Sequence, residues 1–352
     1  MLSVFAHVQP LNFLSASRLS ASVRTSASTS SMSSSVVRIA VVGDVHDFWD
    51  LEEDAKALRF LKPDLVLFTG DFGNENVEGV KSVGDLEFPK AVILGNHDAW
   101  RTQEFSGGNK NRVLLQLECL GQEHVAYRRL DFPILKLSVV GGRPFSHGGK
   151  RIFRKGLLSE RYGVKDMDGS ANKIYKAASG VPGDHLVIIL AHNGPTGLGS
   201  EPNDICGNDF EAESGDHGDL DLAQAIALLK ETTKICIPLV VFGHMHKQLH
   251  GGKGLRKMIA FGADNTIYLN GAIVPRVKIL TDDQGTVNRS FMNNETSVAT
   301  SDSSGTMRAF TLVEIRDGVV HKITETWVAV VGDMATLQEE NILFKHGNQV
   351  LP

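Results

Sequence analysis

Residues 37–47 read VRIAVVGDVHD, an apolar run that ends in a glycine and is followed by an aspartate and a histidine with one residue between them. The run from Val37 to Val42 is typical of a strand that is buried on both faces of a parallel sheet. Gly43 allows the backbone to turn sharply where this strand ends. Asp44 and His46 follow directly, and carboxylates and imidazoles are both common metal ligands. The stretch therefore predicts a buried parallel sheet with metal-binding groups at its edge.

The chain beyond this stretch alternates segments of helical and strand-like character. Residues 50–62 carry apolar side chains at helical spacing, and Pro63 ends the expected helix. Apolar runs within 64–71 and 89–98 predict the next two strands, which are joined by a short polar connection. Strands that alternate with helices form βαβ units, so we expect an α/β fold with a largely parallel sheet.

The rest of the chain supplies further elements and sets the expected domain boundaries. We expect helices over 111–121 and 219–231, and strands over 125–132, 135–142, 185–192, 239–242, 257–263, 309–316 and 320–330. Residues 150–180 are expected to form a charged helical insertion, and residues 281–306 a flexible polar loop. The folded domain is expected to span residues 36–332, with a C-terminal tail over 333–352.

Composition excludes several classes of protein. Hydrophobic residues make up 42% and charged residues 22% of the 352 residues, which is typical of a globular protein. A net charge of −5 provides no general basic surface for nucleic acid. No apolar run reaches the roughly 18 residues that a membrane-spanning helix requires. The three cysteines are widely spaced, so we expect a reducing compartment rather than a disulfide framework.

The first 35 residues differ in composition from everything that follows. They are rich in serine and contain Arg18 and Arg24, and no acidic residue occurs before Asp44. This composition is typical of an organelle transit peptide, and the serine content favours the chloroplast over the mitochondrion. A disordered tail without a targeting role, on a cytoplasmic protein, is the alternative.

Metal-donor residues follow five of the expected strands. They are Asp44, His46, Asp71, Asn96, His192, His244 and His246. The carboxyl ends of parallel strands meet at one edge of a sheet, so we expect these side chains to converge. They exceed the needs of one four- or five-coordinate ion, but they match two ions that share a carboxylate. Each residue alone is more simply explained as a cap or a turn residue, yet that explanation is weak for five strand ends together.

The order and spacing of these groups form a recognisable set of motifs. They are D-x-H at 44–46, G-D at 70–71, G-N-H-D at 95–98, a lone strand-end histidine at His192 and G-H-x-H at 243–246. The set resembles the motifs of the calcineurin-like metallophosphoesterase superfamily. The resemblance implies a four-layer α/β/β/α sandwich with two metal ions. It also implies that one ion binds Asp44, His46, Asp71 and His246, while the other binds Asp71, Asn96, His192 and His244.

The resemblance further implies a mechanism. Two divalent ions, such as Mn, Fe or Zn, would lower the pKa of a bridging water, so that hydroxide attacks phosphorus while the ions neutralise the phosphoryl oxygens. His97 lies next to the expected ligand Asn96, and it is the candidate that protonates the leaving group. Asp98 either orients the His97 ring or caps a helix.

Differences from the family pattern narrow the branch. The stretch GDFGNEN at 70–76 lacks the arginine of the Ser/Thr protein phosphatases, and G-N-H-D replaces their G-N-H-E. G-H-x-H is typical of the phosphodiesterase-like branches, and Asp47 stands where many members have glycine. The chain is also similar to an uncharacterised plant and cyanobacterial group of this superfamily.

Candidate substrate-binding residues are few. Arg143 follows an expected strand, as does His147, and it could clamp a phosphate with two hydrogen bonds or form a surface ion pair. The acidic segment 194–218, with His217, could form a lid or a further metal contact, or a solvated loop with Asp219 as the cap of the next helix. We expect hydrolysis of a small phosphomonoester or phosphodiester, without nucleic-acid or membrane partners. A catalytically inactive protein-binding module is the alternative.

Overall fold

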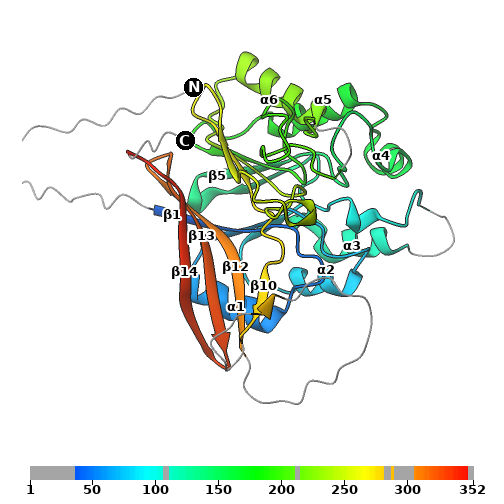
Figure 1. Cartoon of the computed structure of the whole chain (residues 1–352). Helices are drawn as coiled ribbons and strands as arrows, with labels where there is room; N and C mark the ends of the chain where they lie inside the picture. Colours follow the sequence, from blue (N-terminus) through cyan, green and yellow to red (C-terminus); the bar gives the residue numbers. More distant parts are fainter. Residues whose placement is uncertain (1–35, 106–110, 211–214, 281–286, 289–304, 348–352) are drawn as a thin grey trace, which may run out of the picture. The chain divides into compact units, whose positions relative to one another are not determined.

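The computed structural model describes residues 36–105, 111–210, 215–280, 287–288 and 305–347. The targeting segment expected over 1–35, and most of the flexible loop expected over 281–306, lie outside these residues. Two β-sheets pack face to face, and helices lie on their outer faces (Figure 1). This arrangement confirms the expected α/β sandwich of helix, sheet, sheet and helix layers.

The first sheet is built around three parallel strands whose order follows the chain. β1 (Val36–Val42), β2 (Leu65–Phe68) and β3 (Lys90–Val92) are successive neighbours. β12 (Thr306–Arg316) pairs antiparallel with the other side of β1. The sheet is extended by β10 (Val277–Ile279), β11 (Val287–Asn288), β13 (Val319–Val331) and β14 (Met334–Lys345).

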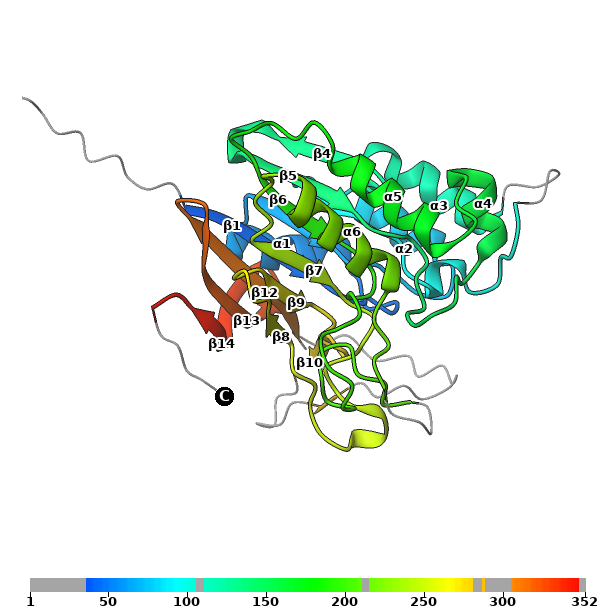
Figure 2. The ribbon, with the colours of Figure 1, turned by 90° about the horizontal axis from the view of Figure 1, so that it is seen from above.

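The second sheet has a parallel centre with antiparallel edges. Its parallel strands, in spatial order, are β5 (Leu137–Gly141), β6 (Leu186–Leu190), β7 (Leu239–Phe242) and β9 (Ile267–Asn270). The edges are β4 (Arg129–Phe132) beside β5 and β8 (Ile259–Phe261) beside β9. Helices α5 (Met167–Ala178) and α6 (Leu220–Thr232) lie on the outer side of this sheet (Figure 2).

The two sheets meet through alternate residues of their strands. Ile39 and Val41 of β1 belong to a buried cluster that also contains Ile188 and Leu190 of β6. Ala40, between them in the chain, belongs to a separate buried cluster that includes the helices. Both faces of β1 are thus covered, which explains why its sequence is apolar without alternation.

The α-helices begin and end with recognisable signals. They are α1 (Leu51–Leu61), α2 (Val77–Gly84), α3 (Arg112–Leu120), α4 (Lys155–Tyr162), α5 (Met167–Ala178) and α6 (Leu220–Thr232), with short 3-10 turns η1 (His97–Ala99), η2 (Gly121–Glu123), η3 (Pro133–Leu135) and η4 (His250–Gly252). For α1, the Asp50 side chain accepts the N–H of Glu53 at 2.9 Å, and Lys62 turns left-handed before Pro63. None of the helices in the described ranges is long and apolar enough to cross a membrane.

The expected C-terminal boundary needs correction. The C-terminal tail expected over 333–352 is wrong for Met334–Lys345, which form β14 and pair with β13. Most side chains of β14 are exposed, and its one apolar run is limited to the three residues 342–344 near its end. Residues 150–180 are largely helical, as expected, but α5 buries Ile174 and Ala178 and contacts β5 and α6. α5 is therefore part of the helical layer.

Candidate metal centre

The predicted metal donors lie just beyond the carboxyl ends of parallel strands in both sheets. They are Asp44 and His46 after β1, Asp71 after β2, Asn96 after β3, His192 after β6, and His244 and His246 after β7. The carboxylate and imidazole ligand atoms among them fall into groups whose members lie within 4.8 Å of one another. The structure thus brings together all the residues that were predicted to bind metal.

Asp44, His46 and His246 form one of these groups, and together with Asp71 they are called position one. The Nε2 atoms of His46 and His246 are 2.9 Å apart, and Oδ2 of Asp44 lies 3.5 Å from Nε2 of His246. Nε2 of His46 lies 3.9 Å from Oδ2 of Asp71. Burial lowers the pKa of His46, even though Asp71 acts in the opposite direction. His46 is therefore neutral near pH 7 and retains a lone pair for a cation.

Position two comprises Asp71, Asn96, His192 and His244. Nε2 of His192 lies 2.9 Å from Oδ1 of Asn96 and 3.4 Å from Oδ1 of Asp71. Nδ1 of His192 donates to the backbone carbonyl of Thr69 at 2.7 Å, which orients the ring with Nε2 toward the other donors. Burial lowers the pKa of His244 well below its ordinary value, so this ring is also neutral.

The two carboxylate oxygens of Asp71 face the two positions separately. Oδ2 is the oxygen near His46, and Oδ1 is the oxygen near His192. Burial by itself raises the pKa of Asp71, but attraction and hydrogen bonding to His192, together with attraction to His97 and His46, hold that pKa well below the usual range. Burial likewise opposes the charge of His192, yet Asp71 raises the pKa of His192 to about 10. A cation that enters position two must therefore displace a proton from His192.

The unpaired atoms of the centre fit divalent cations. Oδ2 of Asp44 and Nε2 of His244 are buried and have no hydrogen-bond partner within the described part of the chain. A buried acceptor without a partner costs about 1–3 kcal/mol, and more when it is charged. Mixed imidazole, carboxylate and amide donors suit Mn²⁺, Fe²⁺ or Zn²⁺ better than Ca²⁺. The donor set therefore fits one such ion in each position.

The backbone of the centre is unusual at four of the donors. The angle φ is 40° at Asp44, 44° at His46, 52° at Asp71 and 67° at His244. Residues with side chains seldom adopt this left-handed conformation, and those that do gather at functional sites. Gly95 is required for a different reason, since a Cβ there would lie 2.2 Å from Oδ1 of Asp71. Local backbone geometry, and not only residue type, places the ligands.

His97 lies beside position one. Its backbone N–H donates to Oδ1 of Asp71 at 2.9 Å, and its ring lies 5.0 Å from the ring of His46. Nδ1 of His97 is 2.7 Å from the amide oxygen of Asn74, and the ring stacks on Trp100 at 4.6 Å. Asn74 was not among the predicted site residues. Its position three residues after Asp71, beyond the same strand, is the sequence signal that could have identified it.

Asp98 has neither of the two roles expected for it. It lies within η1 rather than at the N-cap, and its carboxylate accepts backbone N–H groups. The donors are the amides of Asp71 and Phe72, both at 2.9 Å, and the amide of Gly95 at 2.7 Å. Asp98 thus ties the loop after β2 to the loop after β3. The side chain that orients the His97 ring, a role expected of Asp98, belongs instead to Asn74.

Arg143 is not placed as a phosphate clamp, and its ion pairs are not on the surface. Its side chain is buried, with Nε 2.8 Å from Asp221 Oδ2 and Nη2 2.7 Å from Asp219 Oδ1. Asp219 also accepts the hydroxyl of Ser146 at 2.6 Å and makes no side-chain cap to α6. Arg143 therefore joins the loop after β5 to the start of α6.

The acidic segment expected over 194–218 reaches the metal centre through one histidine. Its carboxylates hold the segment in place: Asp209 pairs with Arg256 at 2.7 Å, and Asp216 accepts the hydroxyl of Thr196 at 2.7 Å. The ring of His217 lies parallel to that of His244, with centroids 6.1 Å apart. Among the interpretations left open by the sequence, the geometry favours a segment that contacts the metal centre.

A cavity lies on the His97 side of the centre. Its volume is about 500 Å³, and it is lined by Asp47, Asn74, Asn76, Arg101 and Arg112. Asn74 connects it to the metal centre because the same side chain contacts the His97 ring. Its charged lining consists of Arg101, Arg112 and Asp47, and Arg112 is paired with Glu78 at 3.1 Å.

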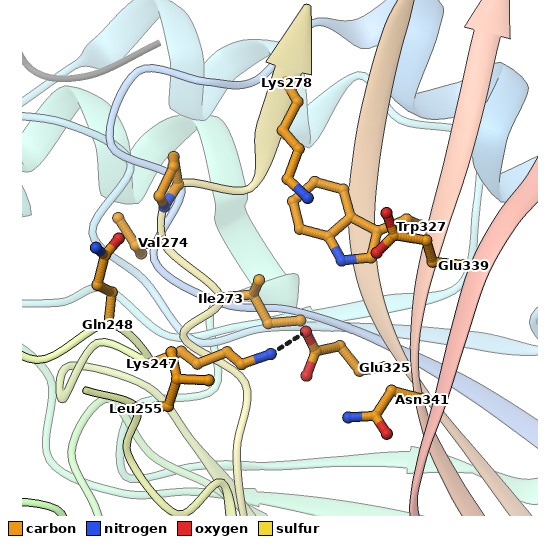
Figure 3. Close-up of a pocket in the computed structure, with 11 residues that line it drawn as sticks. Lys247, Gln248, Leu255, Ile273, Val274, Lys278, Glu325, Trp327, Glu339 and Asn341 are labelled. Atoms are coloured by element: carbon orange, nitrogen blue, oxygen red, sulfur yellow. Dashed lines mark hydrogen bonds and ion pairs between the residues drawn. The ribbon is translucent and has the colours of Figure 1, made fainter. Parts of the chain in front are cut away.

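A second cavity begins at Lys247, directly after His246. Its volume is about 350 Å³. In Figure 3, Lys247 pairs with Glu325, while the Lys278 ammonium lies over the ring of Trp327. The Lys278 Nζ is 3.8 Å from the Trp327 ring centroid. The two lysines that line this cavity are thus already engaged, Lys247 by Glu325 and Lys278 by Trp327.

The comparison with a family model points in the same direction as the geometry. A family model described as calcineurin-like phosphoesterase matches residues 37–248, a range that contains every predicted metal donor. No curated protein matches the chain. The chain is similar to the crystal structure of a dimetal phosphatase from Danio rerio, with TM-score 0.40 and 8% identity over 88% of this chain and 99% of that chain. It is also similar to a conserved uncharacterized protein, a predicted phosphoesterase, from Streptococcus pneumoniae TIGR4, with TM-score 0.30 and 10% identity over 88% of this chain and 98% of that chain.

Proposed function

The chain belongs to the calcineurin-like phosphoesterase family, and from this membership we propose that it hydrolyses a small phosphomonoester or phosphodiester at two divalent cations, in positions one and two. The observation that carries the two-cation proposal is the orientation of Asp71. Its two oxygens face separate groups of donors, so this one carboxylate would be available to cations in both positions. Manganese is the ion we propose to test first, since the donor set suits it.

The residues of the chain have distinct tasks in this proposal. Asp44, His46 and His246 hold the cation of position one, Asn96, His192 and His244 hold that of position two, and Asp71 holds both. Bound cations supply a water of lowered pKa and neutralise charge on the phosphoryl oxygens. The Thr69 carbonyl fixes the tautomer of His192, and Asp98 holds the loops that carry Asp71 and Asn96.

His97 is the residue that protonates the leaving oxygen in this proposal. Asn74 engages its Nδ1, so Nε2 is the atom from which a proton is transferred. Stacking on Trp100 limits the orientations of the ring. The cavity lined by Arg101 and Asn74 lies on this side and provides space for the leaving group.

We expect His97→Ala to lower kcat about 10²- to 10⁴-fold for esters with alkyl leaving groups, as the loss of a general acid does. For p-nitrophenyl esters the loss is expected to be much smaller, because that leaving group departs without protonation. The measurement is kcat across a series of leaving groups, together with the metal content of the purified variant.

The metal content distinguishes two roles for His97. Its ligand nitrogen also lies within 4.8 Å of ligand atoms of His46 and Asp71, so a direct metal contact is the competing role. A variant that loses bound metal would show that His97 is a ligand rather than an acid. His321→Ala is the matched control, because it removes an imidazole that contacts His346. The control is expected to change neither kcat nor metal content.

The general activity has its own test. We expect the full chain loaded with Mn²⁺ to hydrolyse p-nitrophenyl phosphate or bis(p-nitrophenyl) phosphate. The complete set of donors, together with His97, favours this enzyme over an inactive protein-binding module. If Mn, Fe, Zn, Co and Ni all bind but none supports turnover, the binding module becomes the better explanation.

A further inference from the structure

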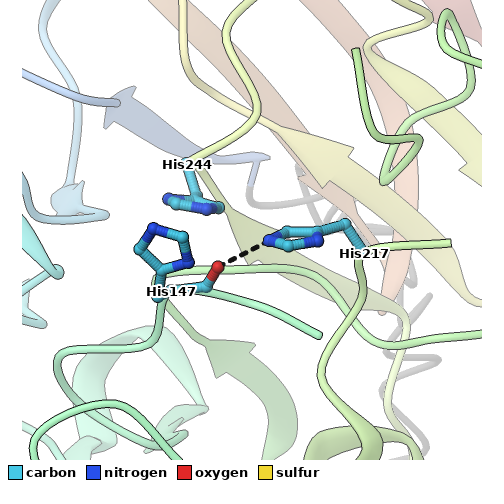
Figure 4. A group of neighbouring side chains, drawn as sticks. All are labelled: His147, His217 and His244. Atoms are coloured by element: carbon cyan, nitrogen blue, oxygen red, sulfur yellow. Dashed lines mark hydrogen bonds between the residues drawn. The ribbon is translucent and has the colours of Figure 1, made fainter. Parts of the chain in front are cut away.

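Three imidazoles form a cluster beside position two. His147 comes from the loop after β5, His217 from the segment before α6, and His244 from the end of β7 (Figure 4). Their ligand nitrogens lie within 4.8 Å of one another. The ring centroids of His147 lie 5.6 Å from His244 and 5.9 Å from His217. Three distant segments of the chain thus bring their rings to one point.

The hydrogen bond of His217 uses the nitrogen at the tip of its ring. Its Nε2 is 2.7 Å from the backbone carbonyl of His147 (Figure 4). A carbonyl only accepts, so Nε2 carries a proton, and a cation bound through this nitrogen would displace that proton. His192 of position two differs, because its Nδ1 donates to the carbonyl of Thr69 at 2.7 Å and its Nε2 is left to face the other donors.

The backbone around His217 is held on both sides. Its N–H donates to the carbonyl of Cys206 at 2.9 Å. Its own carbonyl accepts the N–H of Gly149 at 2.9 Å and the side-chain amide of Asn193 at 2.8 Å. The ring of His217 is therefore fixed by the fold.

The chemistry of the cluster favours a cation over an anion. Three rings whose ligand nitrogens lie within 4.8 Å of one another would repel one another if they were protonated. Neutral rings offer lone pairs, which attract a cation. Nε2 of His244 is buried without a hydrogen-bond partner in the described chain. A phosphate oxygen would instead need N–H donors, and His217 already uses its own on the His147 carbonyl.

We propose that His147, His217 and His244 form a third cation position, suited to Zn²⁺ or to a similar borderline ion such as Co²⁺ or Ni²⁺. Three histidines with an open fourth position are an established zinc-binding arrangement. The proposal goes beyond the hydrolytic function, because these side chains bind a cation whether or not an ester is turned over.

The third position shares His244 with position two, and this sharing has a consequence. A neutral imidazole has one lone pair, so His244 serves one cation at a time. An ion held by the three histidines therefore withdraws a donor from position two. Excess zinc is expected to act as an inhibitor that competes with the cation of position two.

A binding experiment tests the site without relying on activity. His192→Ala removes a donor that belongs to position two alone, and zinc bound by the metal-stripped full chain is then counted by equilibrium dialysis. We expect the His192→Ala chain to lose one further zinc ion when His147→Ala is added. His147→Ala is the preferred change because the backbone carbonyl that orients His217 remains. Adding His321→Ala instead is expected to change nothing.

Two outcomes would overturn the proposal. One is that the His192→Ala chain binds the same number of zinc ions whether or not His147→Ala is added, and that adding His217→Ala instead also leaves the number unchanged. The other is a lack of zinc inhibition of the Mn²⁺-loaded wild type, or an inhibition that His147→Ala leaves unchanged. The expected shift is an increase of about tenfold or more in the inhibitory zinc concentration, normalised to each chain's own uninhibited rate. A chain that binds zinc as expected but hydrolyses no ester would contradict only the proposed function.

Discussion

Asp71→Asn is expected to weaken or empty both cation positions and to lower kcat about 10³-fold or more. The factor corresponds to a loss of about 4 kcal/mol of transition-state stabilisation, within what bound cations supply. Asp71 directs Oδ2 toward His46 and Oδ1 toward His192, so it is the donor that both positions share. An asparagine has no charge, and its amide nitrogen would face one of the positions. Metal content by elemental analysis and kcat on the same preparation measure the effect.

The control for this change is Asp85→Asn, which alters an exposed aspartate paired with Lys81 and located after α2. It is expected to keep both cations and full activity. If Asp71→Asn lost one cation and kept the other at wild-type affinity, Asp71 would be a ligand of one position and not a bridge.

Arg143→Ala is expected to lower the free energy of unfolding by about 3–5 kcal/mol, because it leaves the carboxylates of Asp219 and Asp221 buried without their cation. KM of the folded enzyme is expected to stay close to that of the wild type, since the guanidinium is buried between these carboxylates. Urea unfolding and steady-state kinetics below the unfolding range measure the two quantities.

Arg101→Ala gives the contrast for Arg143. Arg101 is exposed, and its substitution is expected to change stability by about 0.5 kcal/mol or less. If Arg143→Ala left stability unchanged and raised KM strongly, the phosphate-clamp role expected from the sequence would be restored.

The parts of the fold that could be predicted are those buried on two faces. β1, β6 and β7 are covered by a sheet on one side and helices on the other, so their sequences are continuous apolar runs. β14 pairs with β13 at the edge of its sheet and exposes most of its side chains. Its strand conformation depends on a partner and leaves little pattern in the sequence. β9 is buried at all four residues but was also missed, because its apolar run covers only residues 267–269 before the polar Asn270.

Some residues of the candidate site could be predicted from the sequence, and others could not. The metal donors were predictable because each directly follows a buried strand, and strand order then determines where they meet. The partners of Arg143 lie 76 and 78 residues further along the chain, so nothing near Arg143 identifies them. Asn74 and the cluster around His217 likewise depend on contacts between distant segments. The chloroplast address of residues 1–35 stays a prediction, and import of the full chain into isolated plastids would test it.

The left-handed backbone of four donors lowers the stability of the folded chain and at the same time places these donors for a cation. The four residues are Asp44, His46, Asp71 and His244. Each such residue stores about 1–2 kcal/mol of conformational strain in the folded chain. The fold imposes this strain before any cation arrives, so the centre is preorganised and a cation need not reshape it. Glycine at one of these sites would relax the backbone and delete a donor in the same change. The metal-free chain is therefore less stable to unfolding than the cation-bound chain. A cation that binds only the folded chain raises the free energy of unfolding and so offsets the strain.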